Sequence, residues 1–191
     1  MSIQRCIIVH GCFPDAEKVM DLEGGLYEKY WASWIKKELL ARGIEAATPR
    51  MPKPDYPEYE SFKAEFEKLR VDENTVLVGH SCGCGFLARW LGETKTKIAK
   101  LIFVAPWNVS KEEDEARRKF YDYSIDATIP ERVGEIVMFT ADNESRPGKK
   151  SLQILHDALG GEIIDLPGRC HYLIDDMGTA EFPELLEVIS R

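Results

Sequence analysis

The pentapeptide GHSCG at 79–83 is the feature that most constrains how this chain can fold. It follows a short apolar run at 75–78 and precedes a segment with helical character at 86–93. A G-x-S-x-G sequence between a strand and a helix is typical of a tight turn that exposes the serine hydroxyl at the carboxyl end of a sheet. Glycine is needed two residues before and two after the serine, because the backbones of strand and helix crowd the turn. We therefore predict that Ser81 is a nucleophile at a strand–turn–helix corner.

Apolar runs and amphipathic stretches alternate along the whole chain. The apolar runs predict buried strands at 6–9, 44–47, 76–78, 101–104, 136–139 and 163–166. The amphipathic stretches predict helices at 27–42, 58–69, 84–93, 112–123, 149–159 and 180–190. This alternation favours a three-layer α/β/α sandwich around a mostly parallel sheet of roughly six strands. A length of 191 residues, without repeats or linkers, predicts a single domain over 1–191.

The charge and hydropathy of the chain argue against several kinds of partner. The net charge of −8 disfavours nucleic acid and anionic membranes as partners. No apolar stretch approaches the roughly 18 residues needed to span a bilayer. The amino terminus runs directly into the first predicted strand without the pattern of a signal peptide. We therefore expect a cytoplasmic protein that acts on a small-molecule substrate.

Two further strand ends carry residues that suit a serine nucleophile. Asp142 follows the run at 136–139, and His171 lies on the loop after the run at 163–166. The order serine, acid, histidine, each after a strand, is that of the G-x-S-x-G hydrolases. An imidazole titrates near neutrality and can take the proton of a serine hydroxyl, while a carboxylate fixes the imidazole tautomer. We predict Ser81, Asp142 and His171 as the catalytic residues.

Other histidines and carboxylates compete for these roles. His10 follows the first predicted strand and is expected to hold the neighbouring loop. His80 is expected to pack away from the nucleophile, and His156 lies within an amphipathic helix. The competing carboxylates are Glu144, Asp175 and Asp176, of which Glu144 closely follows Asp142 and the last two follow the histidine.

A serine nucleophile also needs two backbone N–H groups for the negative charge that develops on the substrate oxygen. Cys82 is the residue after the nucleophile, and Cys12 lies on the loop after the first strand. Their main-chain N–H groups are therefore predicted to form the oxyanion hole, and the cysteine side chains need not take part.

Cysteine usage gives no sign of a metal or cofactor site. The five cysteines are an odd number, and none of them forms a four-ligand set with the histidines. Cys12, Cys82 and Cys170 lie beside the predicted catalytic positions. They either line an oxidation-sensitive pocket or serve as small hydrophobic residues where backbones crowd, and we favour the second interpretation. We predict no cofactor and no metal.

Taken together, these motifs resemble one known family. The matching segments are IIVHG at 7–11, the aromatic-rich 30–39, RMPKP at 50–54, 75–84, and the loops of Asp142 and His171. In these segments the chain is similar to the small α/β-hydrolases of the retinoblastoma-binding-protein type. The resemblance implies a compact α/β-hydrolase core, a Ser81–Asp142–His171 triad and hydrolysis of small esters or amides.

The chain departs from that family in three places. Cys170 stands where the residue before the histidine is commonly glycine. The loop at 13–26 is longer and more acidic than in relatives. The Leu-x-Cys-x-Glu motif associated with retinoblastoma protein binding is absent, so that partner is not predicted.

The segment between the fourth and fifth strands is too short for a large lid. It spans 106–134 and contains one charged helix. Its aromatic residues either pack this helix onto the core, which we favour, or form one wall of a pocket. These residues are Trp107, Phe120, Tyr121 and Tyr123. A minimal cap predicts a serine hydrolase for small acyl substrates. The alternative is a catalytically weak or inactive hydrolase-fold protein that binds another protein.

Overall fold

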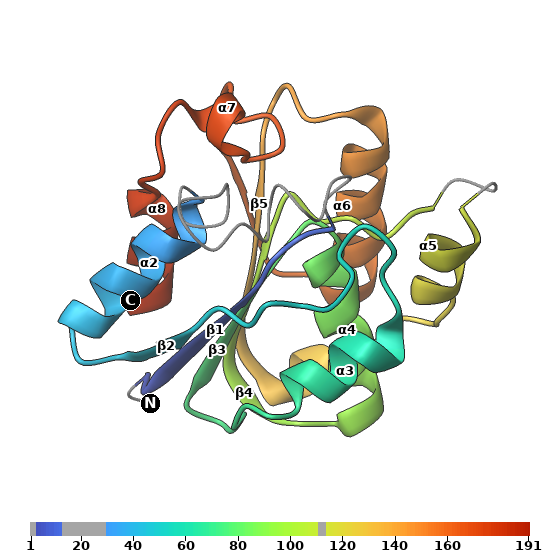
Figure 1. Cartoon of the computed structure of the whole chain (residues 1–191), viewed down its shortest axis with the longest axis horizontal. Coiled ribbons are helices and arrows are strands. Elements are labelled where there is room, and N and C mark those ends of the chain that lie inside the picture. Colours follow the sequence, from blue (N-terminus) through green and yellow to red (C-terminus); the bar gives the residue numbers. More distant parts are fainter. Residues whose placement is uncertain (1–2, 13–29, 111–113) are drawn as a thin grey trace.

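Six parallel strands form the centre of the molecule (Figure 1). The computed structural model describes residues 3–12, 30–110 and 114–191. The strands occur in the order β2-β1-β3-β4-β5-β6, and every neighbouring pair is parallel. Their bounds are β1 Arg5–Val9, β2 Glu45–Ala47, β3 Thr75–His80, β4 Ile98–Val104, β5 Val133–Thr140 and β6 Glu162–Asp165.

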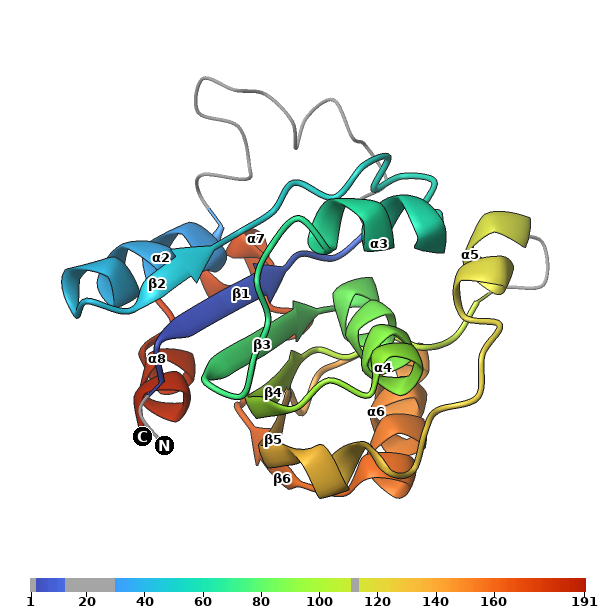
Figure 2. The ribbon, with the colours of Figure 1, turned by 90° about the horizontal axis from the view of Figure 1, so that it is seen from below.

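Helices cover both faces of this sheet, as Figures 1 and 2 show from two directions. One face carries α2 (Trp31–Ala41) and α8 (Pro183–Ser190), which contact each other. The opposite face carries α3 (Tyr59–Phe66), α4 (Cys82–Thr94) and α6 (Arg146–Leu159). The short elements are α5 (Glu115–Phe120), the 3-10 turn η1 (Ile129–Arg132) and α7 (Ile174–Met177).

The strands divide their side chains between two apolar cores, because successive residues of a strand point to opposite faces. In β3, Val76 and Val78 pack with α2 and α8, whereas Leu77 packs with α3, α4 and α6. These side chains are fully buried. The apolar runs of the sequence are therefore continuous because each strand is covered on both faces.

The predicted fold class is confirmed: the described residues form a six-stranded parallel sheet between two helical layers. Each predicted strand and helix is present with shifted ends. The helix predicted at 27–42 is observed from Trp31 to Ala41, and its first three positions lie outside the described residues. The helices α7 and η1 were not predicted. Within the described ranges, no helix is long and apolar enough to cross a membrane.

Candidate active site

Ser81 occupies the turn between β3 and α4, as its sequence context predicts. Its φ of 51° and ψ of −122° are strained for a residue with a side chain. The flanking glycines permit this turn by their lack of a Cβ. A Cβ on Gly79 would lie 2.8 Å from the Cys84 backbone, and one on Gly83 would lie 2.4 Å from the Val9 carbonyl oxygen. The turn can therefore form only with glycine on both sides of Ser81.

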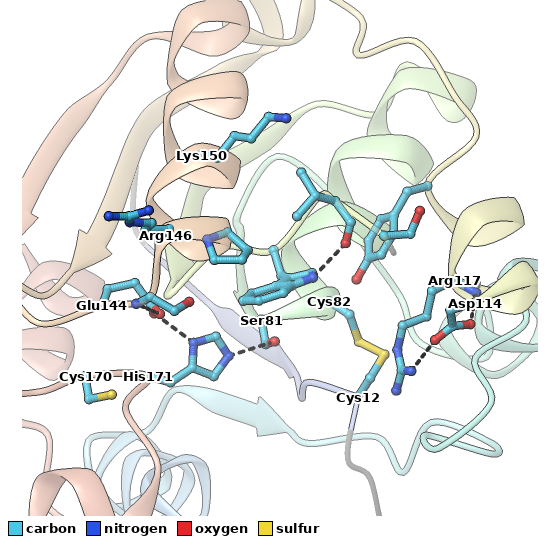
Figure 3. A pocket seen from close by; sticks show the side chains of 16 residues that line it. Cys12, Ser81, Cys82, Asp114, Arg117, Glu144, Arg146, Lys150, Cys170 and His171 are labelled. Atoms are coloured by element: carbon cyan, nitrogen blue, oxygen red, sulfur yellow. Dashed lines mark hydrogen bonds and ion pairs between the residues drawn. A yellow bond between two sulfur atoms is a disulfide. The ribbon is translucent and has the colours of Figure 1, made fainter. Parts of the chain in front are cut away.

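His171 contacts the nucleophile directly (Figure 3). It lies on the loop after β6, and its Nε2 is 3.0 Å from Ser81 Oγ. Its Nδ1 is 2.8 Å from Glu144 Oε2. An ionised carboxylate only accepts hydrogen bonds, so the proton of the neutral imidazole belongs on Nδ1. Nε2 then holds the free lone pair that can accept the hydroxyl proton of Ser81.

The prediction that Asp142 orients this imidazole is wrong, because Glu144 occupies that position. The Asp142 side chain is exposed and instead accepts hydrogen bonds from the N–H groups of Gly168 (2.7 Å) and Asn143 (2.9 Å). The cause is a tight turn, in which the Glu144 N–H donates to the Ala141 carbonyl oxygen at 3.1 Å. This turn directs the fourth residue of the loop, Glu144, rather than the second, Asp142, back toward the sheet.

The Glu144 carboxylate is held in a buried position between the loop and α6. Its side chain is 2 % exposed. A Cβ on Gly148 would lie 2.6 Å from Glu144 Cδ, so the helix packs directly against the carboxylate. Burial raises the pKa of Glu144, but hydrogen bonds from His171 and Ser145 outweigh it and hold this pKa below its ordinary value. The carboxylate is therefore ionised at neutral pH.

Two buried histidines hold the surrounding loops. His10 accepts a hydrogen bond from the Met51 N–H at Nε2 (3.0 Å), and its Nδ1 donates to the Gly11 carbonyl oxygen (2.7 Å). This confirms the predicted structural role of His10. His80 Nε2 donates to the carbonyl oxygen of His171 at 2.9 Å. His80 therefore positions the histidine loop, a function that sequence reasoning missed.

The loop before and after His171 is fixed by its backbone N–H groups. The Cys170 N–H donates to Asn143 Oδ1 at 2.7 Å, and the His171 N–H donates to Asp176 Oδ2 at 3.1 Å. Asp176 thus contacts the backbone of His171 rather than its ring. Cys170 has a φ of 45°, in the left-handed region that favours glycine. A residue with a side chain thus adopts, directly before the histidine, a backbone conformation that glycine would adopt more readily.

Cys12 and Cys82 are joined by a disulfide, with their Cα atoms 5.7 Å apart. The interpretation of these two cysteines as small hydrophobic residues is therefore wrong, whereas Cys170 is a free thiol. Cys82 is the first residue of α4, so its N–H has no acceptor within the helix. Both cysteines line the same pocket as Ser81. Their assignment as oxyanion-hole donors agrees with this placement and stays a prediction.

A pocket of about 870 Å³ opens over the Ser81 hydroxyl. Trp107 and Tyr121 line it, and the Trp107 ring meets the His171 ring edge-on with centroids 5.7 Å apart. Phe120 instead lies in the core, and the Tyr123 hydroxyl donates to the Gly85 carbonyl oxygen at 2.9 Å. The four aromatic residues of this segment are thus divided between pocket wall and core packing.

Charged side chains also line this pocket. The cationic ones are Arg117, Arg146 and Lys150. Arg117 forms an ion pair with Asp114 across the short helix α5. Over 3–12, 30–110 and 114–191, no group of three or more histidine, cysteine or carboxylate side chains is arranged to hold a metal ion. The acidic loop predicted at 13–26 lies outside these ranges.

Comparisons with known proteins support the family and the fold. A family model described as "Serine hydrolase" matches residues 24–191. YdeN of Bacillus subtilis (strain 168) is 39% identical over 64 residues, which are 32% of this chain and 34% of that protein. The match thus spans about a third of the length of that curated relative.

Solved structures share the fold over nearly the whole chain. The structure of the ydeN gene product from B. subtilis has a TM-score of 0.81 at 22% identity, covering 97% of this chain and 96% of that chain. Est1E from Butyrivibrio proteoclasticus has a TM-score of 0.63 at 12% identity, covering 99% of this chain and 86% of that chain. At such identities these likenesses establish the α/β-hydrolase fold alone.

Proposed function

This chain belongs to the serine hydrolase family, and on that premise we propose that it cleaves small carboxylic esters, thioesters or amides through an acyl-serine intermediate. The observation that carries the proposal is the continuous hydrogen-bond chain from Glu144 through His171 to Ser81, with distances of 2.8 and 3.0 Å. Each member supplies what the next one needs for nucleophilic attack.

In the acylation step, the Ser81 hydroxyl oxygen attacks the substrate carbonyl carbon while His171 Nε2 takes its proton. The imidazolium that forms is stabilised by the buried Glu144 carboxylate, which stays ionised. The protonated Nε2 then gives its proton to the leaving oxygen, sulfur or nitrogen. The acyl group is left as an ester on Ser81.

Deacylation repeats this sequence with water. His171 takes a proton from a water molecule, the hydroxide attacks the acyl-serine, and the Ser81 oxygen leaves with the proton from the imidazolium. In both steps the carbonyl oxygen of the substrate becomes an oxyanion. We assign its two hydrogen-bond donors to the backbone N–H groups of Cys12 and Cys82, next to the nucleophile.

The substrate that we propose is small and soluble. The described part of the segment between β4 and β5 forms one short helix, α5, beside the pocket, whereas η1 directly precedes β5 and lies at the opposite, amino-terminal edge of the sheet. This segment is therefore too small to form a large lid over the pocket. Each buried methylene adds about 0.8 kcal/mol of transfer energy only where a groove encloses it. The acidic charge of the chain supports a small-molecule partner rather than nucleic acid or an anionic membrane.

Labelling with a fluorophosphonate probe tests the proposal. Wild-type protein should be labelled, and Ser81→Ala should lose labelling together with turnover of a short nitrophenyl ester, by about 10³-fold or more. Ser110→Ala is the matched control, because Ser110 lines the same pocket but is not the serine whose Oγ is hydrogen-bonded to His171 Nε2. If Ser81→Ala retains turnover, the acyl-serine mechanism at Ser81 is wrong. If the wild type neither reacts with the probe nor turns over the ester, the protein-binding alternative gains support.

A further inference from the structure

The Cys12–Cys82 disulfide joins the two residues to which we assign the oxyanion hole. Cys12 lies three residues beyond the end of β1, and Cys82 directly follows the nucleophile. Figure 3 shows the bond at the pocket, close to Ser81. The two residues are 70 positions apart in the chain, so the covalent link connects two separate loops at the reacting centre.

The Cys82 donor is held firmly without this bond. Cys82 is 1 % exposed and begins α4. The turn around it is fixed further by the Ser81 carbonyl oxygen, which accepts hydrogen bonds from Cys84 N–H (3.0 Å) and Trp107 N–H (3.1 Å). The position of the Cys82 N–H is therefore set by the helix and the turn.

The β1 loop is fixed as far as Gly11. His10 anchors the Gly11 carbonyl oxygen, and a Cβ on Gly11 would lie 2.8 Å from Ser81 Cβ, so the backbone rests on the nucleophile. The Cys12 N–H belongs to the same planar peptide unit as the Gly11 carbonyl, so the His10 hydrogen bond orients it from the β1 side. The Cys12 side chain packs against the core and carries the disulfide, and among the described residues no backbone hydrogen bond involves Cys12. The disulfide is thus the covalent tie between this peptide unit and the turn that carries the Cys82 N–H.

We propose that this disulfide is a positioning element of the oxyanion hole, and that reducing it lowers turnover without unfolding the protein. Oxyanion donors stabilise the transition state only when they are held at hydrogen-bond distance from the developing charge beforehand. Releasing Cys12 from Cys82 leaves the nucleophile, His171 and Glu144 in place but removes the covalent tie between the two loops that carry the donors. The Gly11–Cys12 peptide then keeps its hydrogen bond to His10 and can shift relative to the Cys82 turn. The inference rests on the proposed serine hydrolase function.

The reduction is a two-electron exchange with a dithiol. A thiolate of the dithiol attacks the more accessible sulfur, that of Cys12, which lies in the pocket wall, and the Cys82 thiolate leaves. The second thiol of the reagent then displaces the Cys12 thiolate and closes the reagent into a cyclic disulfide. The two protons lost by the dithiol end on the Cys12 and Cys82 thiols. A cytoplasmic location, which the sequence predicts, would expose the bond to such reductants.

The experiment compares oxidised, reduced and reoxidised wild-type protein. Dithiothreitol is removed by desalting under nitrogen, and mass spectrometry after alkylation of an aliquot counts the free thiols and maps the Cys12–Cys82 link. We expect reduction to lower kcat for a short nitrophenyl ester by at least about 10-fold, up to the ~10²–10³-fold cost of losing one oxyanion donor. KM should stay within about threefold, and reoxidation should restore kcat, because the lost contact exists only in the transition state.

Further readouts separate positioning from a general loss of structure. The affinity for a boronic acid that mimics the tetrahedral intermediate should fall with kcat, whereas the far-ultraviolet circular dichroism and the pH midpoint of kcat should not change. Cys12→Ala should show the same loss without reductant and no further loss with it, which also excludes effects through the free thiol of Cys170. If Cys12→Ala fails to fold, reduction and reoxidation of the wild type still give the answer.

The outcomes distinguish this inference from the proposed function. Reduced, folded wild type that turns over within twofold of the oxidised form overturns the positioning role and leaves the hydrolase assignment intact. The positioning role is equally wrong if the loss lies wholly in KM, or if the purified protein contains no Cys12–Cys82 link. Absence of turnover and of fluorophosphonate labelling in both redox forms overturns the proposed function itself.

Discussion

Replacing Glu144 by glutamine should remove most of the hydrolase activity, even though Asp142, the other candidate for the orienting acid, is unchanged. The Glu144 carboxylate accepts hydrogen bonds from His171 Nδ1 (2.8 Å) and from the Ser145 N–H (2.6 Å). Both neighbours are donors. A glutamine side chain has one accepting oxygen and one donating NH₂ group. In one orientation its NH₂ group faces the Ser145 N–H, which is also a donor. In the other orientation its NH₂ group faces His171 Nδ1, the nitrogen that must carry the proton.

The magnitude follows from the imidazole tautomer. If the glutamine NH₂ donates to Nδ1, the ring must carry its proton on Nε2 and can no longer accept the proton of Ser81. The equivalent Asp→Asn change in the trypsin triad lowers kcat by about 10⁴-fold. At about 1.36 kcal/mol per factor of ten, this is about 5 kcal/mol of transition-state stabilisation. We expect a loss of about 10³–10⁴-fold in kcat for Glu144→Gln, with little change in KM.

Asp142→Asn is the matched control. Its side-chain oxygen accepts from two backbone N–H groups, and the asparagine oxygen can still accept from both. Steady-state kinetics on a short nitrophenyl ester should place Asp142→Asn within about threefold of the wild type, since an exposed neutral substitution of this kind changes little. A Glu144→Gln enzyme with more than a tenth of wild-type kcat, or an Asp142→Asn enzyme below a hundredth, would refute the assignment of Glu144.

Three other expectations concern the turn, the buried histidines and the acyl chain. Gly83→Ala should destabilise the protein by about 1–3 kcal/mol or more in denaturant titration, because its Cβ would meet the Val9 carbonyl oxygen at 2.4 Å; Gly92→Ala in the same helix, where the nearest atom is a side-chain carbon at 3.3 Å, should cost far less. Burial lowers the pKa of His10 to about 4 and of His80 to about 3, so these rings stay neutral in the fold while the unfolded chain takes up protons near pH 6.5. The free energy of unfolding should therefore decrease as pH falls from about 6.5 to about 4, by about 3 kcal/mol for the first ring alone, and a flat profile over that window would contradict the reasoning. Across nitrophenyl esters from acetyl to palmitoyl, kcat/KM should peak at short chains, and a maximum at about ten carbons or more would show a groove that buries methylenes.

The sequence predicts the sheet well, because each strand is buried on both faces and therefore reads as a continuous apolar run. It also locates the three loops of the candidate site, since parallel strands bring their carboxyl ends to one edge. It does not identify which side chain of a loop points inward. Asp142 and Glu144 are two residues apart, and only the turn from Ala141 decides between them.

The disulfide lies beyond sequence reasoning for a related cause. Cys12 and Cys82 are far apart in the chain, and their pairing depends on β1 and β3 being neighbours in the sheet. Cysteine spacing does not determine connectivity. The sequence indicates this disulfide only by placing a cysteine after each of two predicted strands. The two cysteines come together only if those strands are parallel neighbours in the sheet.

Burial distinguishes the reactive histidine of this site, His171, from the two structural histidines, His10 and His80. His10 and His80 are 2 % and 1 % exposed, and burial lowers the pKa of both, so they stay neutral at pH 7. Each uses one ring N–H to hold a backbone carbonyl oxygen, that of Gly11 in one case and that of His171 in the other. Only His171 has a buried carboxylate behind one nitrogen and the serine hydroxyl before the other. If His10 or His80 were protonated, its ring would keep the hydrogen bond to the carbonyl oxygen but would place a charge in the core. At neutral pH these two rings therefore position the loops as uncharged groups, and His171 is the ring that carries the proton during the reaction.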